Sequence, residues 1–223
     1  MRVGVGATWP VFSPDGSRLV YTESLRGRCS LNEHDLARNT DRAVTQTKQS
    51  TMIGCMSSLD WSPDGKSLLV RSDTSLVIMT LDGAVTSRIA RPGGIWDGHF
   101  SPDGKRIAYS SDETGRTEVY VQALAGGLPT RVSAEGGRWP NWTSDGRRIV
   151  FMTPAGKVQE VTSTDATQFG TPRTLFTVGS WRRSTFDDRG LGFAMVGDGE
   201  RYIVRQATSG IAVALVQHWT TMR

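Results

Sequence analysis

The sequence predicts an all-β fold built from repeated four-stranded units, and three observations point to it. The tetrapeptide Ser-Pro-Asp-Gly occurs at residues 13–16, 62–65 and 101–104, each time directly after an aromatic residue. Runs that alternate between apolar and polar residues follow these turns, and no segment shows a convincing helical period. The chain also contains 25 glycines among 223 residues, which suits short strands joined by tight turns.

The tetrapeptide has the composition of a tight hairpin turn. Serine suits its first position, proline supplies the φ of about −65° needed at the second, and glycine closes the turn in a left-handed conformation. A fourth copy at 143–146 carries Ser144 in place of proline, and a fifth, weaker copy lies at 196–199. The closing glycines are at 16, 65, 104, 146 and 199, so the steps are 49, 39, 42 and 53 residues. A spacing of this size indicates a repeat architecture.

The third repeat shows the predicted strands most clearly. Residues 95–100 lead into the turn, 105–111 and 117–124 follow as strands, and 129–133 form a short polar fourth strand. The other repeats keep this order, with second strands at 17–22, 66–71, 147–152 and 200–205, third strands at 75–81, 157–162 and 211–217, and fourth strands at 84–90 and 172–177. One such meander buries too little apolar surface to be stable alone, so the units must stack. Radially stacked four-stranded units are the blades of a β-propeller.

We therefore expect residues 1–223 to form a single β-propeller domain with five recognisable blades. The first blade begins almost at Met1, and the last shows only three convincing strands, so a truncated six-bladed ring is a second interpretation. The stretch from Phe186 to Gly190 has the position of a turn but has lost the pattern, which makes the fifth blade irregular.

Composition excludes several classes of protein. The net charge is +4, but the basic residues are scattered, so no stripe for nucleic acid forms. Two cysteines, Cys29 and Cys55, are too few for a disulfide framework; they are either buried thiols or a single bridge. No apolar run is long enough to span a membrane. Residues 1–6 lack the apolar run of a signal peptide, so export would need a leader that this sequence does not contain.

No catalytic, metal-binding or cofactor-binding constellation can be assembled from known motifs. Residues 60–67 resemble the end of a phosphate-binding loop, but its first glycine is missing and the turn joins two strands. No G-x-S-x-G nucleophile motif occurs. The histidines His34, His99 and His218 lack metal spacing, and 197–200 lack the acidic positions of a calcium loop. We expect no enzyme activity, no metal and no cofactor.

The first strand of each blade lines the channel of a propeller, so candidate binding residues should lie there. Because side chains alternate along a strand, the residue before each turn aromatic points away from that aromatic. The candidates for a ligand or partner site at the channel mouth are Trp9, Asp60, Trp96, Asp97, His99, Trp139 and Asn141. The other interpretation is that they only cap the channel. The aromatics themselves, Phe12, Trp61, Phe100 and Trp142, are expected to pack one blade on the next.

The repeats resemble the WD40-like (PD40) β-propeller repeats of the TolB type. The resemblance is carried by Phe100-Ser-Pro-Asp-Gly-Lys-Arg-Ile-Ala-Tyr through Gln122, by Gly170-Thr-Pro-Arg-Thr-Leu-Phe176, by Val213-Ala-Leu-Val-Gln-His-Trp219, and by residues 9–21. The stretch 61–219 is also similar to the propeller at the C-terminal end of many bacterial serine/threonine protein kinases. The chain itself contains neither a kinase domain nor the additional N-terminal domain of TolB.

The resemblance implies a propeller that binds other proteins or ligands and catalyses nothing. TolB-like propellers belong to the periplasm and cell envelope, while the sequence alone leaves the compartment open. Our leading hypothesis is a non-catalytic module that binds a protein partner or a small ligand. Two alternatives stay open: the gating propeller of a prolyl-oligopeptidase-type peptidase, and a propeller enzyme acting on sugars. The latter needs paired carboxylates, for which only Asp60 and Asp97 are candidates.

Overall fold

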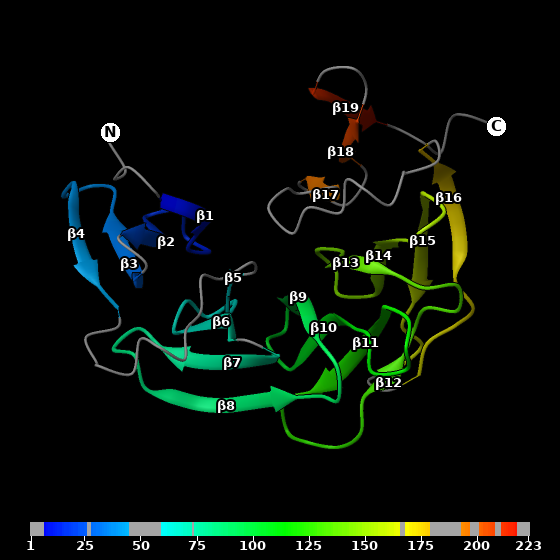
Figure 1. Cartoon of the computed structure of the whole chain (residues 1–223), viewed down its shortest axis with the longest axis horizontal. Helices are drawn as coiled ribbons and strands as arrows, with labels where there is room; N and C mark the ends of the chain where they lie inside the picture. Colours follow the sequence, from blue (N-terminus) through cyan, green and yellow to red (C-terminus); the bar gives the residue numbers. More distant parts are fainter. Residues whose placement is uncertain are drawn as a thin grey trace. The chain divides into compact units, whose positions relative to one another are not determined.

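The structure is a computed structural model that describes residues 7–25, 28–44, 59–72, 74–165, 168–178, 193–196, 201–207 and 211–217. Every regular element in these ranges is a β-strand. The strands form four four-stranded sheets and one three-stranded sheet, and within each sheet every strand is hydrogen-bonded to the next one along the chain (Figure 1). The predicted all-β fold of four-stranded antiparallel blades is therefore confirmed.

The strand bounds follow the repeat. The first blade consists of β1 (Ala7–Phe12), β2 (Arg18–Leu25), β3 (Arg28–Asp35) and β4 (Thr40–Ala43). The second consists of β5 (Leu59–Trp61), β6 (Ser67–Ser72), β7 (Ser75–Thr80) and β8 (Val85–Ala90). The third consists of β9 (Ile95–Phe100), β10 (Arg106–Ser111), β11 (Glu118–Ala123) and β12 (Thr130–Arg131). The fourth consists of β13 (Arg138–Trp142), β14 (Arg148–Met152), β15 (Lys157–Thr162) and β16 (Arg173–Thr177). The last sheet consists of β17 (Phe193–Val196), β18 (Arg201–Ala207) and β19 (Ile211–Gln217).

The repeated tetrapeptides fold as the predicted hairpin turns. In the third copy the Gly104 N–H donates to the Ser101 carbonyl oxygen at 2.8 Å, and the Ser101 N–H donates to the Arg106 carbonyl oxygen at 2.8 Å. Asp103 Oδ1 accepts the Ser101 hydroxyl and the Lys105 N–H. The closing glycine has a φ of 67°, a left-handed value that favours glycine. The other described turns share this hydrogen-bond pattern.

One predicted strand is shorter than expected. Residues 129–133 were expected as the fourth strand of the third blade, but β12 contains only two residues. The Val119 N–H donates to the Ser133 hydroxyl oxygen at 2.7 Å, so a side chain takes a bond that a strand backbone would make. The Ser133 hydroxyl and the Gly136 N–H both donate to the buried Glu118 carboxylate. The Val132 N–H still donates to the Val119 carbonyl oxygen at 2.9 Å, and side-chain bonding replaces the ladder beyond that bond.

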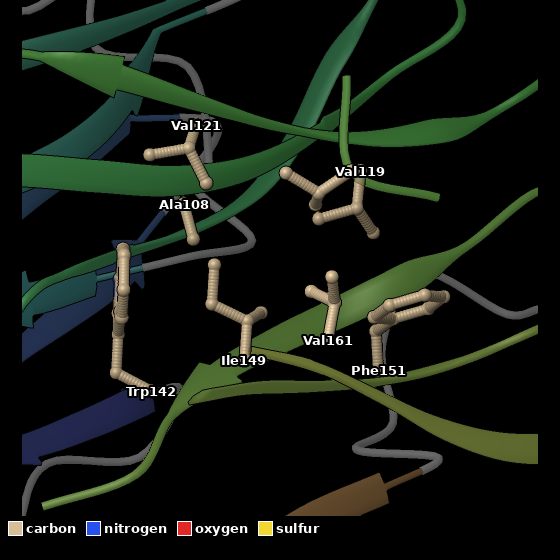
Figure 2. Packing of buried hydrophobic residues seen from close by; sticks show 8 residues of the cluster. Ala108, Val119, Val121, Trp142, Ile149, Phe151 and Val161 are labelled. Carbon is tan, nitrogen blue, oxygen red and sulfur yellow. The ribbon is translucent and has the colours of Figure 1, made fainter. Parts of the chain in front are cut away.

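The chain divides into two compact units, Met1–Phe100 and Ser101–Arg223. The core of the first unit packs the first two blades together through Val20, Leu31, Val44, Trp61, Leu68, Val70 and Met79. The core of the second packs the third blade against the fourth through the residues labelled in Figure 2: Ala108, Val119, Val121, Trp142, Ile149, Phe151 and Val161. The expectation that residues 1–223 form one domain stays a prediction.

Several expectations concern residues outside the described ranges. These are the leader question at residues 1–6, the redox state of Cys55, the irregular turn near Phe186, the fifth turn beyond Val196, and His218. The side chain of Cys29 is likewise outside the described part of the structure.

Candidate functional site

The turn aromatics are buried at three of four positions, and at Trp61 and Trp142 they pack one blade on the next, as expected. Trp61, Phe100 and Trp142 are 4%, 7% and 7% exposed. The Trp61 Nε1–H donates to the Val11 carbonyl oxygen of the preceding blade at 3.1 Å. The expectation is wrong for Phe12, which is 59% exposed. Trp61 and Trp142 pack against buried residues of the preceding blade, and Phe12 belongs to the first blade.

Arginines that sequence reasoning did not single out cover two of these aromatics. The Arg18 guanidinium carbon lies 4.9 Å from the centre of the Trp61 ring, and its Nη2 lies 3.5 Å from the Gly65 carbonyl oxygen. Arg106 repeats this arrangement at 4.6 Å from Trp142 and 3.4 Å from the Gly146 carbonyl oxygen. The available signal was an arginine two residues after the turn glycine. These are cation–π contacts between successive blades.

Two buried glutamates bind pairs of arginines in the same way. In the first blade Glu33 accepts bonds from Arg18 at 3.0 Å and from Arg42. In the fourth blade Glu160 takes the corresponding position and pairs with Arg148 at 3.3 Å and with Arg173 at 2.6 Å. Each glutamate joins the second, third and fourth strands of its blade. These ion pairs join the strands within each of the two blades.

Among the predicted site residues, the structure brings Asp60 and His99 together. Asp60 lies on β5 and His99 on β9, and Asp60 Oδ2 lies 3.6 Å from His99 Nδ1. The same oxygen accepts the backbone N–H of Phe100 at 2.8 Å. Burial alone lowers the pKa of His99, but the Asp60 carboxylate and then the Asp97 charge outweigh it, so the pKa is raised. His99 is therefore charged to a higher pH than an ordinary histidine.

Trp96 and Asp97 lie on β9, upstream of His99. The Arg71 guanidinium carbon at the end of β6 lies 4.5 Å from the centre of the Trp96 ring. Trp96, Asp97 and His99 are all half-buried, so parts of each side chain face solvent. Gly98 between them is buried, and an added Cβ there would meet Leu76 at 2.9 Å and Leu69 at 3.2 Å. The second blade therefore fixes the backbone that presents these three side chains.

The two candidates on β13 belong to a β-bulge. The register between β13 and β14 shifts between Arg138 and Asn141, and Trp139 has a φ of 53°. The Asn141 amide donates to the Trp139 carbonyl oxygen at 2.8 Å. Trp139 packs against the buried residues Val150, Met152 and Val158 of its own blade. Both residues thus shape the fourth blade, and strict alternation could not have placed Trp139 on this face.

The last candidate, Trp9, lies on β1 beside a similar register shift between Thr8 and Val11, and its side chain is outside the described part of the structure. Within the described ranges no three His, Cys, Asp or Glu side chains gather as they would around a metal ion. The described residues also contain no helix of the length and apolarity needed to cross a membrane.

Comparison with known proteins identifies the repeat. Residues 7–184 match the family model PD40, described as the TolB beta propeller domain. An uncharacterized protein of Agrobacterium fabrum is 29% identical over 171 residues, 73% of this chain and 53% of that protein. The Tol-Pal system protein TolB of Francisella tularensis subsp. mediasiatica is 28% identical over 158 residues, 66% of this chain and 35% of that protein.

A solved structure shows the same fold. The crystal structure of TolB from Acinetobacter baumannii superposes with a TM-score of 0.72 at 19% identity, covering 95% of this chain and 51% of that one. This chain spans about half or less of the length of these proteins.

Proposed function

The chain belongs to the PD40 family of TolB β-propeller domains, and on that premise we propose that it is a non-catalytic module that binds a protein partner. The partner contacts the candidate residues of β5 and β9. The match to the TolB beta propeller domain covers residues 7–184, and this supports a binding role for the scaffold. A fold alone does not define a function, so the choice of residues rests on the site itself.

The observation that carries the proposal is the arrangement on β9. Trp96, Asp97 and His99 share one short strand, each partly open to solvent, on a backbone seated against Leu69 and Leu76. A tryptophan with polar groups beside it, on a rigid strand, has the composition of an energetic centre in a protein interface. The partner would bury the Trp96 ring and hydrogen-bond to the polar side chains.

Site-specific crosslinking tests this proposal. A photoreactive amino acid at position 97 should crosslink one partner in the source cells, whereas the same group at Val85 should not. Val85 is a suitable control because it is 56% exposed and lies on the outer strand β8. With the partner purified, Trp96→Ala should weaken binding at least about tenfold, as for a central interface residue, and Val85→Ala should leave it unchanged. Equal binding by wild type and Trp96→Ala would refute the proposed site.

The enzymatic alternatives predict a different outcome. A sugar-cleaving propeller would need Asp60 free to act on substrate, but Asp60 Oδ2 accepts the Phe100 N–H and contacts His99. We therefore expect Asp60→Asn to weaken partner binding. We expect no catalytic activity that depends on Asp60. Hydrolysis of any glycoside or peptide by the purified chain, lost in Asp60→Asn, would overturn the non-catalytic assignment.

A further inference from the structure

The contacts between successive blades are not all of one kind. The first blade holds the second, and the third holds the fourth, through an arginine over a tryptophan: Arg18 over Trp61 and Arg106 over Trp142. Where the second blade meets β9, both members of this pair are replaced. Ser67 occupies the arginine position and Phe100 the tryptophan position. The guanidinium–indole pair of this contact lies at other positions, where Arg71 of β6 is 4.5 Å from the centre of the Trp96 ring on β9.

A different polar contact is present at this place. Asp60 of the second blade reaches β9, where its Oδ2 accepts the Phe100 N–H at 2.8 Å and lies 3.6 Å from His99 Nδ1. One carboxylate thus binds the backbone and the side chain of adjacent residues. Gly98 next to them allows β9 to approach Leu69 and Leu76 closely. The Asp60–His99 contact therefore lies next to this close approach of β9 to the second blade.

We propose that the attachment of β9 to the second blade is pH-responsive, because it contains an imidazole–carboxylate pair, Asp60 with His99, beside the Arg71–Trp96 contact. A guanidinium stays charged at every physiological pH, whereas an imidazole loses its charge near neutrality. The cation–π contacts at Trp61 and Trp142 therefore keep their charge while the contact at His99 does not. The blade contacts of one molecule then respond differently to the same change in pH.

The charges around His99 give the direction of the response. Asp60 on β5 and Asp97 on β9 both favour the imidazolium, and Arg71 of β6 lies over the Trp96 ring. Burial opposes them, but the pKa of His99 is raised above its ordinary value of 6.5. A group with a raised folded-state pKa contributes its full stability below the unfolded-state value and loses it as pH rises through the folded-state value. The Asp60–His99 contact thus stabilises the attachment of β9 most in mild acid and least at alkaline pH.

Hydrogen exchange in the full chain tests the proposal independently of any binding partner. The protection factor of the Phe100 amide, corrected for the intrinsic effect of pH, should fall about three- to tenfold between pH 6 and pH 9, because the His99 imidazolium loses its proton over this range. His99→Asn should remove this fall. His34→Asn replaces a histidine of the first blade that contacts Asp41 at 3.0 Å, and it should keep the fall.

A second variant and a direct titration complete the test. Ser67→Arg with Phe100→Trp copies the guanidinium–indole pair and should keep the amide of residue 100 protected at pH 9. An unchanged protection factor in wild type, or a full fall in His99→Asn, would overturn the proposal. If the variants do not fold, NMR titration of His99 in the wild-type chain decides: an imidazole pKa of 6.5 or lower contradicts the proposal.

Discussion

At the scale of single residues, the turn aspartates link the repeat to pH. Asp15 accepts bonds from Ser13 and Ser17, which lower its pKa to about 2. Hydrogen bonds lower the pKa values of Asp64 and Asp145 in the same way, from Ser62 and Thr143 first. At Asp103 slight burial opposes the lowering, but the bonds from Ser101 and Lys105 prevail. The four turns therefore favour charged carboxylates.

We expect replacement of these four aspartates by asparagine to make the free energy of unfolding less dependent on pH between pH 5 and pH 2. A lowered folded-state pKa contributes stability above the ordinary value of 3.8, and this stability is lost as pH falls toward the lowered value, which is about 2 for Asp15. Asparagine keeps an acceptor but does not titrate. Thermal unfolding from pH 5 to pH 2 measures the effect, with Glu113→Gln outside the repeated turns as the control. A variant as acid-sensitive as wild type would contradict this.

Arg106 provides the second prediction at this scale. Arg106→Ala removes the contact with the Trp142 ring and the bonds to the Gly146 carbonyl oxygen and the Ser163 hydroxyl oxygen. We expect a loss of about 1.5–3 kcal/mol in the free energy of unfolding, from a partly buried cation–π contact and two hydrogen bonds. Urea titration measures it. Arg131→Ala, at an exposed position of β12, should change stability by less than about 0.5 kcal/mol. Equal effects of the two variants would refute the role of the stacked guanidinium.

At the scale of elements, a buried carboxylate joins three strands of the fourth blade. The Glu160 side chain is 4% exposed and pairs with Arg148 and Arg173. We expect Glu160→Gln to cost about 2–3 kcal/mol, somewhat below the usual range for breaking a buried pair, because both arginines can turn toward water. Glu135→Gln breaks the exposed pair with Lys157 and should cost at most about 1 kcal/mol. Chemical denaturation of both variants under one condition makes the comparison, and similar costs would contradict it.

The strands themselves could largely be predicted from the sequence. Predicted residues 157–162 and 211–217 coincide with β15 and β19, because both runs are rich in the β-branched residues that favour strands. The bulge in β13 could not be predicted, since the left-handed conformation of Trp139 is held by the Asn141 amide. The length of β12 was likewise missed, because Ser133 and Glu118 bond where a ladder was expected.

The candidate site was only partly predictable for a related reason. Alternation placed Asp60 and His99 on first strands, and the structure brings them to 3.6 Å. That contact depends on the spacing between β5 and β9, which is set by packing at Gly98 rather than by any local pattern. The role of Arg71 over Trp96 was missed because the two residues are far apart in the sequence.

At the scale of the whole molecule, each compact unit has its own core, and this predicts separable losses of stability. Phe151 is fully buried in the second unit (Figure 2). We expect Phe151→Ala to cost about 3–5 kcal/mol, because the cavity adds to the lost transfer free energy. Amide exchange should speed up in β10, β11 and β13–β15, while β2, β3, β6 and β7 keep their protection. If amide exchange became faster to the same extent in both units, the two units would unfold as one, and the prediction would be wrong.

The stacked Arg–Trp pairs also bear on how such a protein can be duplicated or recombined. Each pair has one member in each of two successive blades, as in Arg18 with Trp61 and Arg106 with Trp142. A recombination boundary between two blades separates the arginine from its tryptophan. The blade that is moved then packs against a neighbour that lacks the matching residue. A segment such as 106–142, from a second strand to the next first strand, carries both members. In chimeric proteins we expect segment 106–142 to keep its contact between Arg106 and Trp142 when it is moved to another propeller.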